Sequence, residues 1–147
     1  MLDVDTAARL RVVLGRMSRR LRPTSAGVAA GLTPTRSSVL LTVVRNGPLR
    51  LAEVAQAEGI NPTMLSRVVS ELVAGGLLER LSDDGDRRAA WVKATAAGCR
   101  LAERMRGERT DALKTALTAL SHAERQTLEE ALPALEELAE QLKAPAR

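Results

Sequence analysis

The sequence of 147 residues predicts a mainly α-helical fold with one β-hairpin. Three observations support this: apolar residues recur at helical spacing over most of the chain, two Thr-Pro or Asn-Pro pairs mark helix starts, and two strand-like segments flank an Asp-Gly pair. The expected order is helix, helix, short strand, helix, helix, strand, hairpin tip, strand, helix, helix. The length suits one domain, or a domain with an oligomerisation element.

The first two helices are defined by periodicity and by their ends. The first is expected from Asp5 to Arg22, where Pro23 and the small residues after it stop it. Its apolar positions are Leu10, Val13, Leu14, Met17 and Leu21. The second begins at Thr33-Pro34, an N-cap followed by a proline at the first helical position, and runs to about Arg45. The Asn46-Gly47-Pro48 segment ends it.

The third and fourth helices are joined by a very short turn. The third covers Leu51 to Glu58, with Val54 and Ala55 facing inward, and Gly59 suits the residue after its end. The fourth begins at Asn61-Pro62 and stops at Gly75-Gly76. Its apolar stripe consists of Leu65, Val68, Val69, Leu72 and Val73. A short turn that contains glycine between two such helices is typical of a helix-turn-helix motif.

A hairpin and two further helices complete the chain. Residues 77–81 and 89–94 are the expected strands, so Asp84-Gly85 lies at the hairpin tip. A helix-turn-helix followed by such a hairpin is a winged helix-turn-helix arrangement. A long helix is expected over residues 95–120, and Ser121 to Glu124 has the capping-box pattern that starts the last helix. Pro133 falls inside this last helix and is expected to kink it.

The polar face of the fourth helix indicates a partner. Thr63, Ser66, Arg67 and Ser70 lie opposite its apolar stripe, and none of them is acidic. Hydroxyl groups can donate to phosphates, and an arginine can hold guanine through two hydrogen bonds. The positive N-terminus at Asn61-Pro62 favours the same anionic partner. The pattern therefore predicts binding of double-stranded DNA, against the alternative of a simple solvated face.

The chain resembles the MarR (multiple-antibiotic-resistance regulator) family of bacterial transcription factors. The resemblance rests on "LTPTRSSVLLTVVRNGPLRLAEVAQAEGINPTMLSRVVSELVAGGLLER" and on "DGDRRAAWVKATAAG". Asp86-Arg87-Arg88 fits the family's Asp-x-Arg wing pattern. Thr95 to Gly98 fits the Thr-x-x-Gly that opens the next helix, with Ala94 in place of the usual leucine before it.

The resemblance implies an intertwined homodimer with residues 1–32 as an N-terminal dimerisation helix, 33–95 as the DNA-binding domain and 96–147 as C-terminal dimerisation helices. It implies that Arg88 enters a minor groove and that Asp86 orients Arg88 or Arg67. In addition, Arg87 or Lys93 is expected to touch the flanking phosphates. Together with the residue pattern, it gives a set of expected DNA contacts. They are Ser38, Thr63, Met64, Ser66, Arg67, Ser70, Asp86, Arg87, Arg88 and Lys93.

The apolar seams support a dimer independently of the resemblance. One small domain could not bury the stripe of the first helix together with that of the last. The latter consists of Leu128, Leu132, Leu135, Leu138 and Leu142. A two-fold dimer predicts a pseudo-palindromic operator with half-sites about one turn of DNA apart. The family further implies a small amphipathic or phenolic effector, in a pocket drawn from the first, second and fifth helices. Arg16, Arg19 and Arg20 could meet an anion there, although a solvated face is the simpler reading.

Other functions find little support. His122, the only histidine, has no Cys or carboxylate spaced with it as a catalytic triad or metal site, so neither an enzyme nor a metal or cofactor is expected. A single cysteine, Cys99, and no long apolar run favour a reducing, cytoplasmic compartment without membrane insertion. Cys99 is expected to be a small buried residue, with redox sensing as the alternative. A winged helix used for protein contacts is the other alternative.

Overall fold

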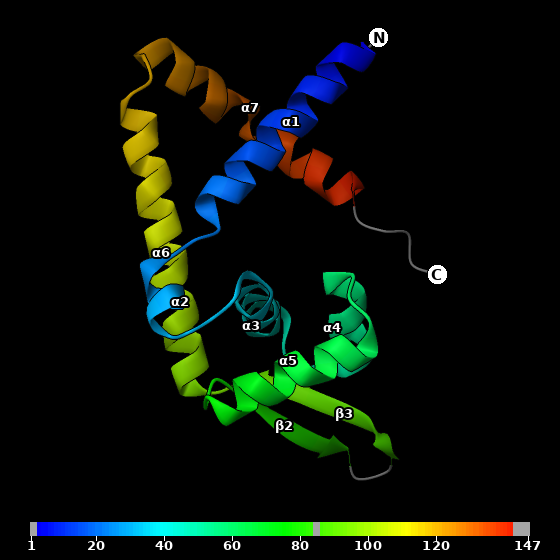
Figure 1. Cartoon of the computed structure of the whole chain (residues 1–147). Helices are drawn as coiled ribbons and strands as arrows, with labels where there is room; N and C mark the ends of the chain where they lie inside the picture. The colour runs from blue at the N-terminus through cyan, green and yellow to red at the C-terminus, as the bar shows by residue number, and fades with distance from the viewer. Residues whose placement is uncertain (1–2, 84–85, 143–147) are drawn as a thin grey trace. The chain divides into compact units, whose positions relative to one another are not determined.

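The computed structural model describes residues 3–83 and 86–142, and the side chains of residues 82–89 lie outside this description. Figure 1 shows the chain, whose described part contains seven helices and three strands. In chain order they are α1 (Val4–Leu21), α2 (Ser25–Ala29), α3 (Pro34–Asn46), β1 (Leu49–Arg50), α4 (Leu51–Glu58), α5 (Pro62–Ala74), β2 (Leu78–Asp83), β3 (Asp86–Ala94), α6 (Ala96–Thr118) and α7 (His122–Gln141).

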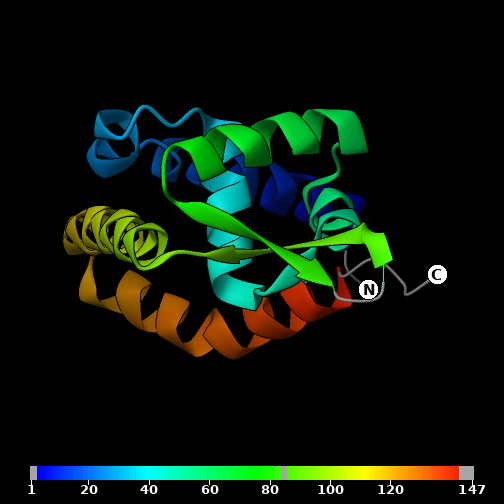
Figure 2. The same cartoon turned by 90° about the horizontal axis from the view of Figure 1, so that it is seen from below.

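The chain forms two compact units. The first covers residues 1–110 and contains α1 to α5, the sheet and most of α6; the second covers residues 111–147 and contains the end of α6 and all of α7. The sheet is antiparallel with β3 in the centre, in the order β1-β3-β2. Figure 2 shows β2 and β3 as a long hairpin beside α5. The predicted winged helix-turn-helix fold is thereby confirmed.

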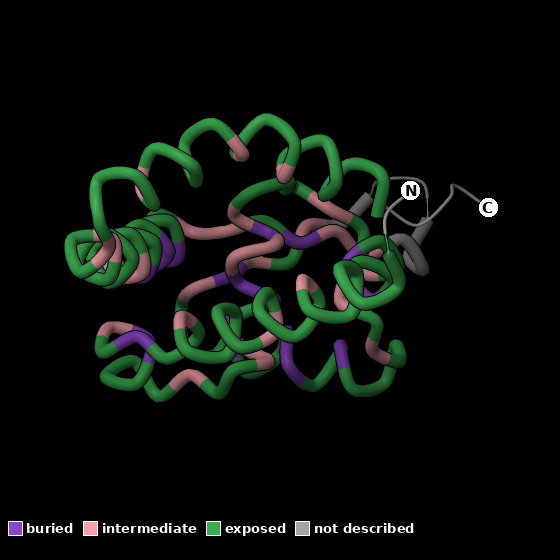
Figure 3. Tube along the Cα trace, turned by 90° about the horizontal axis from the view of Figure 1, so that it is seen from above, coloured by how far each residue is buried: buried purple, intermediate pink, exposed green. Residues whose placement is uncertain are grey.

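The core of the first unit is built from the expected stripes. Its buried residues are Val39, Leu40, Val43, Val54, Ala55, Leu65, Val68, Val69, Leu72, Leu78, Val92, Leu101 and Met105. They come from α3, α4, α5, α6, β2 and β3. In Figure 3 these buried positions gather among the helices and strands of this unit. The core therefore fixes α5 by one face and leaves its other face exposed.

The predicted helix starts around the helix-turn-helix are confirmed. The side chains of Thr33 and Asn61 cap α3 and α5, and a proline follows each of them. Gly59 has φ of +65°, in the left-handed region that glycine adopts most readily, and it lets the chain turn sharply between α4 and α5. The bounds of α4 agree with the prediction, and both strands of the hairpin are slightly longer than predicted.

The short helix α2 was not predicted, because the groups that start it lie far apart in the sequence. Thr24 caps it locally through the backbone N–H of Gly27. The Glu108 carboxylate of α6 accepts hydrogen bonds from the backbone N–H groups of Ser25 and Ala26, at 2.7 and 2.9 Å, and from the Ser25 hydroxyl. These hydrogen bonds lower the pKa of Glu108, with that from the Ser25 side chain as the largest cause.

The Thr-x-x-Gly segment joins the base of the hairpin to α6. The Thr95 hydroxyl donates to the carbonyl of Gly76 at 2.6 Å and accepts from the N–H of Gly98 at 3.0 Å. The N–H of Thr95 donates to the carbonyl of Leu77 at 3.1 Å. A Cβ on Gly98 would collide with that carbonyl oxygen, so the close approach of α6 requires glycine here.

The helices at the two ends of the chain expose their apolar stripes. Neither α1 nor α7 has a buried residue. The exposed apolar residues include Val13, Leu14 and Met17 on α1, and Leu128, Leu132, Leu138 and Leu142 in or just after α7. Ser121 and Glu124 form the predicted capping box at the start of α7, where these hydrogen bonds lower the pKa of Glu124. The seams exist as predicted, and what covers them stays a prediction.

Cys99 departs from the expectation, because it is exposed. The core-facing side of α6 carries Gly98, Leu101, Ala102 and Met105, and Cys99 falls just outside this stripe. In the described ranges, no helix is both long and apolar enough to cross a membrane.

Candidate nucleic-acid interface

The exposed face of α5 carries all five of its predicted contact residues. Thr63, Met64, Ser66, Arg67 and Ser70 are exposed, whereas the alternate face of the same helix is buried. Four of the five positions, those other than Met64, follow at intervals of three and four residues, so they lie on one side of the helix. The result is a polar, arginine-containing surface on a helix whose other side is held by the core.

The N-terminus of α5 is open toward solvent. The Asn61 side chain accepts from the backbone N–H of Met64 at 2.8 Å, and Asn61, Pro62 and Thr63 are exposed. The partial positive charge of the helix end therefore lies beside Thr63 and Met64. An anionic ligand that approaches this end meets a favourable field.

One acidic residue of α5, Glu71, lies close to this face, and its charge is compensated. The Arg36 guanidinium of α3 donates to the Glu71 carboxylate through Nε at 2.7 Å, and its Nη2 lies 2.7 Å from the same oxygen. Sequence reasoning did not identify this pair, because the two residues are 35 positions apart. Arg36 reduces the repulsion that Glu71 would otherwise exert on a phosphate.

Sequence reasoning did not assign Arg80 to the site, although it lies beside α5. Its Nη2 donates to the Ser70 hydroxyl at 2.9 Å and lies 3.5 Å from the carbonyl oxygen of Ser66. The side chain comes from β2 and is exposed. The predicted reading face of α5 therefore has, in addition to Arg67, an arginine that is supplied by the wing and contacts Ser66 and Ser70.

Two predicted phosphate contacts have intramolecular partners. Lys93 forms an ion pair with Glu79 on the neighbouring strand, at 2.9 Å. The Ser38 hydroxyl donates to the Glu58 carboxylate at 2.7 Å and lies in the wall of a cavity. Neither arrangement tests whether these groups contact DNA, and both assignments stay predictions.

The predicted wing residues Asp86, Arg87 and Arg88 are in β3, but their side chains lie outside the described part of the structure. The backbone register is informative. Ser82 pairs with Ala90 and Asp83 pairs with Asp86, so the pairing shifts between Ser82 and Asp83. Arg87 and Arg88 fall in this irregular stretch of β3. Asp84 and Gly85, the predicted tip, are outside the described residues.

Trp91 lies on the return strand, as expected, and is stacked under an arginine. It pairs with Arg50 of β1 and with Leu81 of β2. The guanidinium carbon of Arg50 lies 5.1 Å from the centroid of the indole ring. Arg50 is also the residue that precedes α4, and its N–H donates to Glu53. The sheet edge is thereby tied to the start of the helix-turn-helix.

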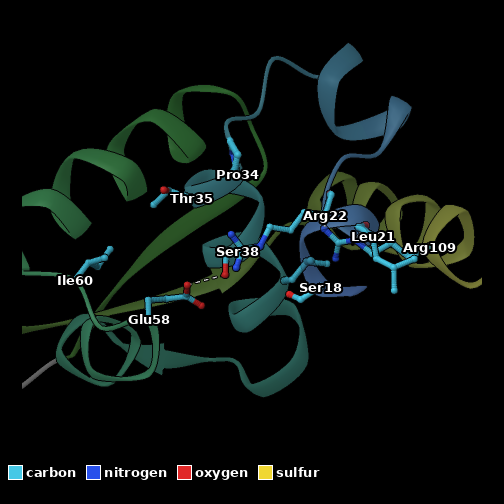
Figure 4. Close-up of a pocket in the computed structure, with 10 residues that line it drawn as sticks. Ser18, Leu21, Arg22, Pro34, Thr35, Ser38, Glu58, Ile60 and Arg109 are labelled. Carbon is cyan, nitrogen blue, oxygen red and sulfur yellow. Dashed lines mark hydrogen bonds between the residues drawn. The ribbon is translucent and has the colours of Figure 1, made fainter. Parts of the chain in front are cut away.

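The first unit also contains a cavity of about 550 Å³. Its walls come from α1, α3, α6, the last residue of α4 and the segment between α4 and α5. The lining residues include Leu21, Leu41, Ile60, Ser38, Glu58, Arg22 and Arg109 (Figure 4). None of Arg16, Arg19 and Arg20 lines it; all three are exposed on α1.

Arg109 is built into the wall of this cavity. It donates to the carbonyls of Leu21 and Arg22, each at 3.1 Å. Burial lowers the pKa of Arg109 below the ordinary arginine value, and the nearby charge of Arg22 lowers it further. Two neighbouring arginines in one cavity wall favour a bound anion, whereas the Glu58 carboxylate in the same wall opposes one.

Comparison with known proteins places the chain among regulators. A family model described as "MarR family" matches residues 30–89. A helix-turn-helix-type transcriptional regulator of Mycobacterium tuberculosis is 29% identical over 133 residues, which cover 89% of this chain and 92% of the relative. The structure resembles Rv1404 of M. tuberculosis with a TM-score of 0.80 and 24% identity, over 100% of this chain and 99% of the other. It also resembles a variant of MepR from Staphylococcus aureus bound to an oligodeoxyribonucleotide, with a TM-score of 0.63, 18% identity and coverage of 90% and 96%.

Proposed function

Because the chain belongs to the MarR family of transcriptional regulators, we propose that it acts as a homodimer that binds a pseudo-palindromic DNA operator. One observation carries this proposal. The exposed face of α5 presents Thr63, Ser66, Arg67 and Ser70 with no acid among them, and the nearby Glu71 is paired with Arg36. Such a face fits the negatively charged major groove, where hydroxyl and guanidinium groups read base edges and phosphates. Regulators of this family are not enzymes.

Salt-dependent binding to duplex DNA tests the proposal against a protein-binding role. For a duplex selected from a random-sequence library, the logarithm of the binding constant is expected to fall linearly with the logarithm of the salt concentration. The slope of this line should be about −0.9 for each phosphate that the protein neutralises. The double variant Thr63→Glu/Ser66→Glu introduces acids into the face without touching the core, and it should abolish binding. Salt-independent or absent duplex binding by the unaltered protein would leave the protein-interaction role as the better explanation.

We further propose that the protein is a repressor that releases DNA when a small amphipathic or phenolic effector occupies the cavity. The cavity draws on α1, α3 and α6, which are the helices expected from the sequence, and its apolar wall includes Leu21, Leu41 and Ile60. Ile60 lies in the turn between α4 and α5, so a ligand there would touch the helix-turn-helix directly.

A matched pair of small molecules tests this effector site. 4-Hydroxybenzoate carries a phenol and an anionic group, and 4-hydroxybenzamide has nearly the same shape without the charge. The anion should raise the melting temperature more and should weaken duplex binding. Arg22→Ala should remove the difference between the two molecules, whereas Arg16→Ala, outside the cavity, should preserve it. Equal or absent effects of both molecules on the unaltered protein would reject an anionic phenolic effector here.

A further inference from the structure

We propose that Arg80 is a phosphate contact and that Ser70 is the residue that holds it in place. This inference deepens the proposed DNA binding and rests on it. It assigns a role to a residue of β2, the first strand of the wing, whose side chain contacts the recognition helix α5. It also changes the expected role of Ser70, from direct phosphate donor to positioning residue.

The register of the hairpin places Arg80 on the same side of the sheet as α5. Arg80 pairs with Val92, which is fully buried, and directly opposed residues of an antiparallel pair share one face. The neighbouring pair, Glu79 and Lys93, therefore points to the other face, where the two side chains form their ion pair. Arg80 and Lys93 thus lie on opposite faces of the hairpin, and of these two cations it is Arg80 that faces the recognition helix.

The side chain of Arg80 is fixed against the exposed face of α5. Its Nη2 lies 2.9 Å from the Ser70 hydroxyl and 3.5 Å from the Ser66 carbonyl oxygen. Ser66 and Ser70 are one helical turn apart and both belong to the predicted reading face. A duplex whose major groove receives α5 carries a phosphate backbone past the edge of that helix, toward the wing. The Arg80 guanidinium lies between β2 and α5, where this phosphate backbone would pass.

In the described part of the structure, the Arg80 guanidinium contacts neutral groups. Two other cations of this region, Arg36 and Lys93, are each paired with a carboxylate. Among the side chains that the structure describes, no carboxylate pairs with Arg80, whose partners are the Ser70 hydroxyl and the Ser66 carbonyl. Ordering an arginine costs conformational entropy, and a pre-ordered guanidinium suits the planar recognition of a phosphate. The arrangement therefore favours an anionic ligand over a purely structural tie.

Ser70 acts through Arg80 in this arrangement. Its oxygen accepts the hydrogen bond from Arg80, so the loss of the hydroxyl releases the guanidinium from α5. A direct phosphate contact by Ser70 would make the same contribution whether or not Arg80 is present. A positioning role predicts that the effect of Ser70 disappears when Arg80 is replaced, and this difference can be measured.

The experiment uses the full chain and a duplex selected from a random-sequence library, over a series of salt concentrations. Arg80→Gln keeps a side-chain donor for Ser70 and removes the charge. Arg80→Gln should lower the magnitude of the salt slope, the slope of log affinity against log salt concentration, by up to about 2. The reason is that each of the two subunits loses one phosphate contact. The loss of affinity should be equal on preferred and scrambled duplexes. Arg104→Ala, which removes an exposed arginine of α6, should leave the slope unchanged.

A double-mutant cycle completes the test. Ser70→Ala should weaken binding in the unaltered protein and should have no further effect in the Arg80→Gln protein. An unchanged slope for Arg80→Gln, or an equal decrease for Arg104→Ala, would overturn the phosphate contact. Additive effects of Ser70→Ala and Arg80→Gln would overturn the positioning role. If the unaltered protein shows no salt-dependent duplex binding, the proposed function itself fails, and that result differs from a failure of Arg80 alone.

Discussion

At the scale of single residues, the exposed polar face of α5 was predictable from the sequence, whereas the contacts around it were not. Thr63, Ser66 and Arg67 follow from helical periodicity, because buried positions identify the opposite face. The pairing of Arg36 with Glu71, and of Arg80 with Ser70, joins different elements. No local pattern encodes such contacts, since they depend on how helices and strands pack in space.

Arg67 is expected to read a base. Arg67→Ala should cost about 1–3 kcal/mol of binding free energy and relax the preference at one base position in each half-site. Arg67→Lys keeps the positive charge but cannot donate two parallel hydrogen bonds to one base. It should therefore lose the base preference and retain most of the non-specific affinity for DNA. Selection of duplexes by each variant measures both effects. A loss that is uniform across all sequences would move Arg67 from base reading to phosphate binding.

Arg88 is expected to enter the minor groove, by resemblance to the family. Arg88→Ala should reduce the magnitude of the salt slope by up to about 2 and should weaken binding most on A·T-flanked duplexes, whose narrow groove attracts arginine. Asp86→Ala should also weaken binding if Asp86 orients Arg88. If Asp86 acts only as a nearby negative charge, its removal should tighten binding instead. Measurements on A·T-flanked and G·C-flanked duplexes separate these outcomes, and unchanged affinity for Arg88→Ala would contradict the assignment.

At the scale of elements, the sequence predicted the helices whose capping residues are close in the sequence. It did not predict α2, whose second capping residue is distant in the sequence. Thr33, Asn61 and Ser121 cap their helices through neighbouring residues, as the sequence indicates. The helix α2 depends on Glu108, which is 83 positions away from Ser25. Periodicity cannot identify such a helix, because five residues hold too little pattern and the second cap comes from another element.

The Glu108 cap makes the region around α2 sensitive to acid. Hydrogen bonds lower the folded-state pKa of Glu108 from the ordinary value of 4.5, so its contribution is present above that value and is lost as the pH falls through the lower, folded-state pKa. Hydrogen exchange of the Ser25 and Ala26 amides should therefore accelerate in that acidic range. Glu108→Gln should remove this dependence, and Glu103→Gln, an exposed carboxyl on the same helix, should not. A pH-independent exchange rate in the unaltered protein would contradict the role of the cap.

Two glycines of α6 should respond in opposite ways to the same substitution. Gly98→Ala places a methyl group against the Leu77 carbonyl, and it should destabilise the protein by about 1–3 kcal/mol. Gly107 has open space around it, so Gly107→Ala should stabilise the helix by roughly 0.5–1 kcal/mol. Denaturant unfolding measures both variants. Similar effects of the two substitutions would show that the close approach at Gly98 is not required.

At the scale of the whole molecule, the sequence indicates a dimer through what the chain leaves uncovered. The stripes of α1 and α7 contain no buried residue, although their spacing is that of packed helices. Exposed apolar surface of this kind generally marks an interface. The identity of the partner surface cannot be deduced from one chain. An apolar stripe on a helix indicates that another surface covers it, but it does not indicate which segment provides that surface.

Truncation tests the dimer directly. Removal of residues 1–22, or of everything after Leu132, should give unfolded or insoluble protein, since half of each apolar seam loses its partner. Removal of residues 143–147 deletes none of the seam leucines and should leave the dimer intact. Analytical ultracentrifugation and thermal unfolding follow the outcome. A soluble, folded monomer from either of the longer truncations would contradict the dimer.

The stacking of Arg50 on Trp91 has a consequence for spectroscopy. The chain contains no Phe or Tyr, so Trp91 is its only aromatic side chain and the sole source of its near-ultraviolet fluorescence. The indole contacts the residue that precedes α4 and lies on the strand that returns from the wing. The unlabelled protein therefore carries one intrinsic fluorophore at the junction of the two parts that are predicted to face DNA. A shift in its emission reports a movement of that junction, with no contribution from any other position in the chain.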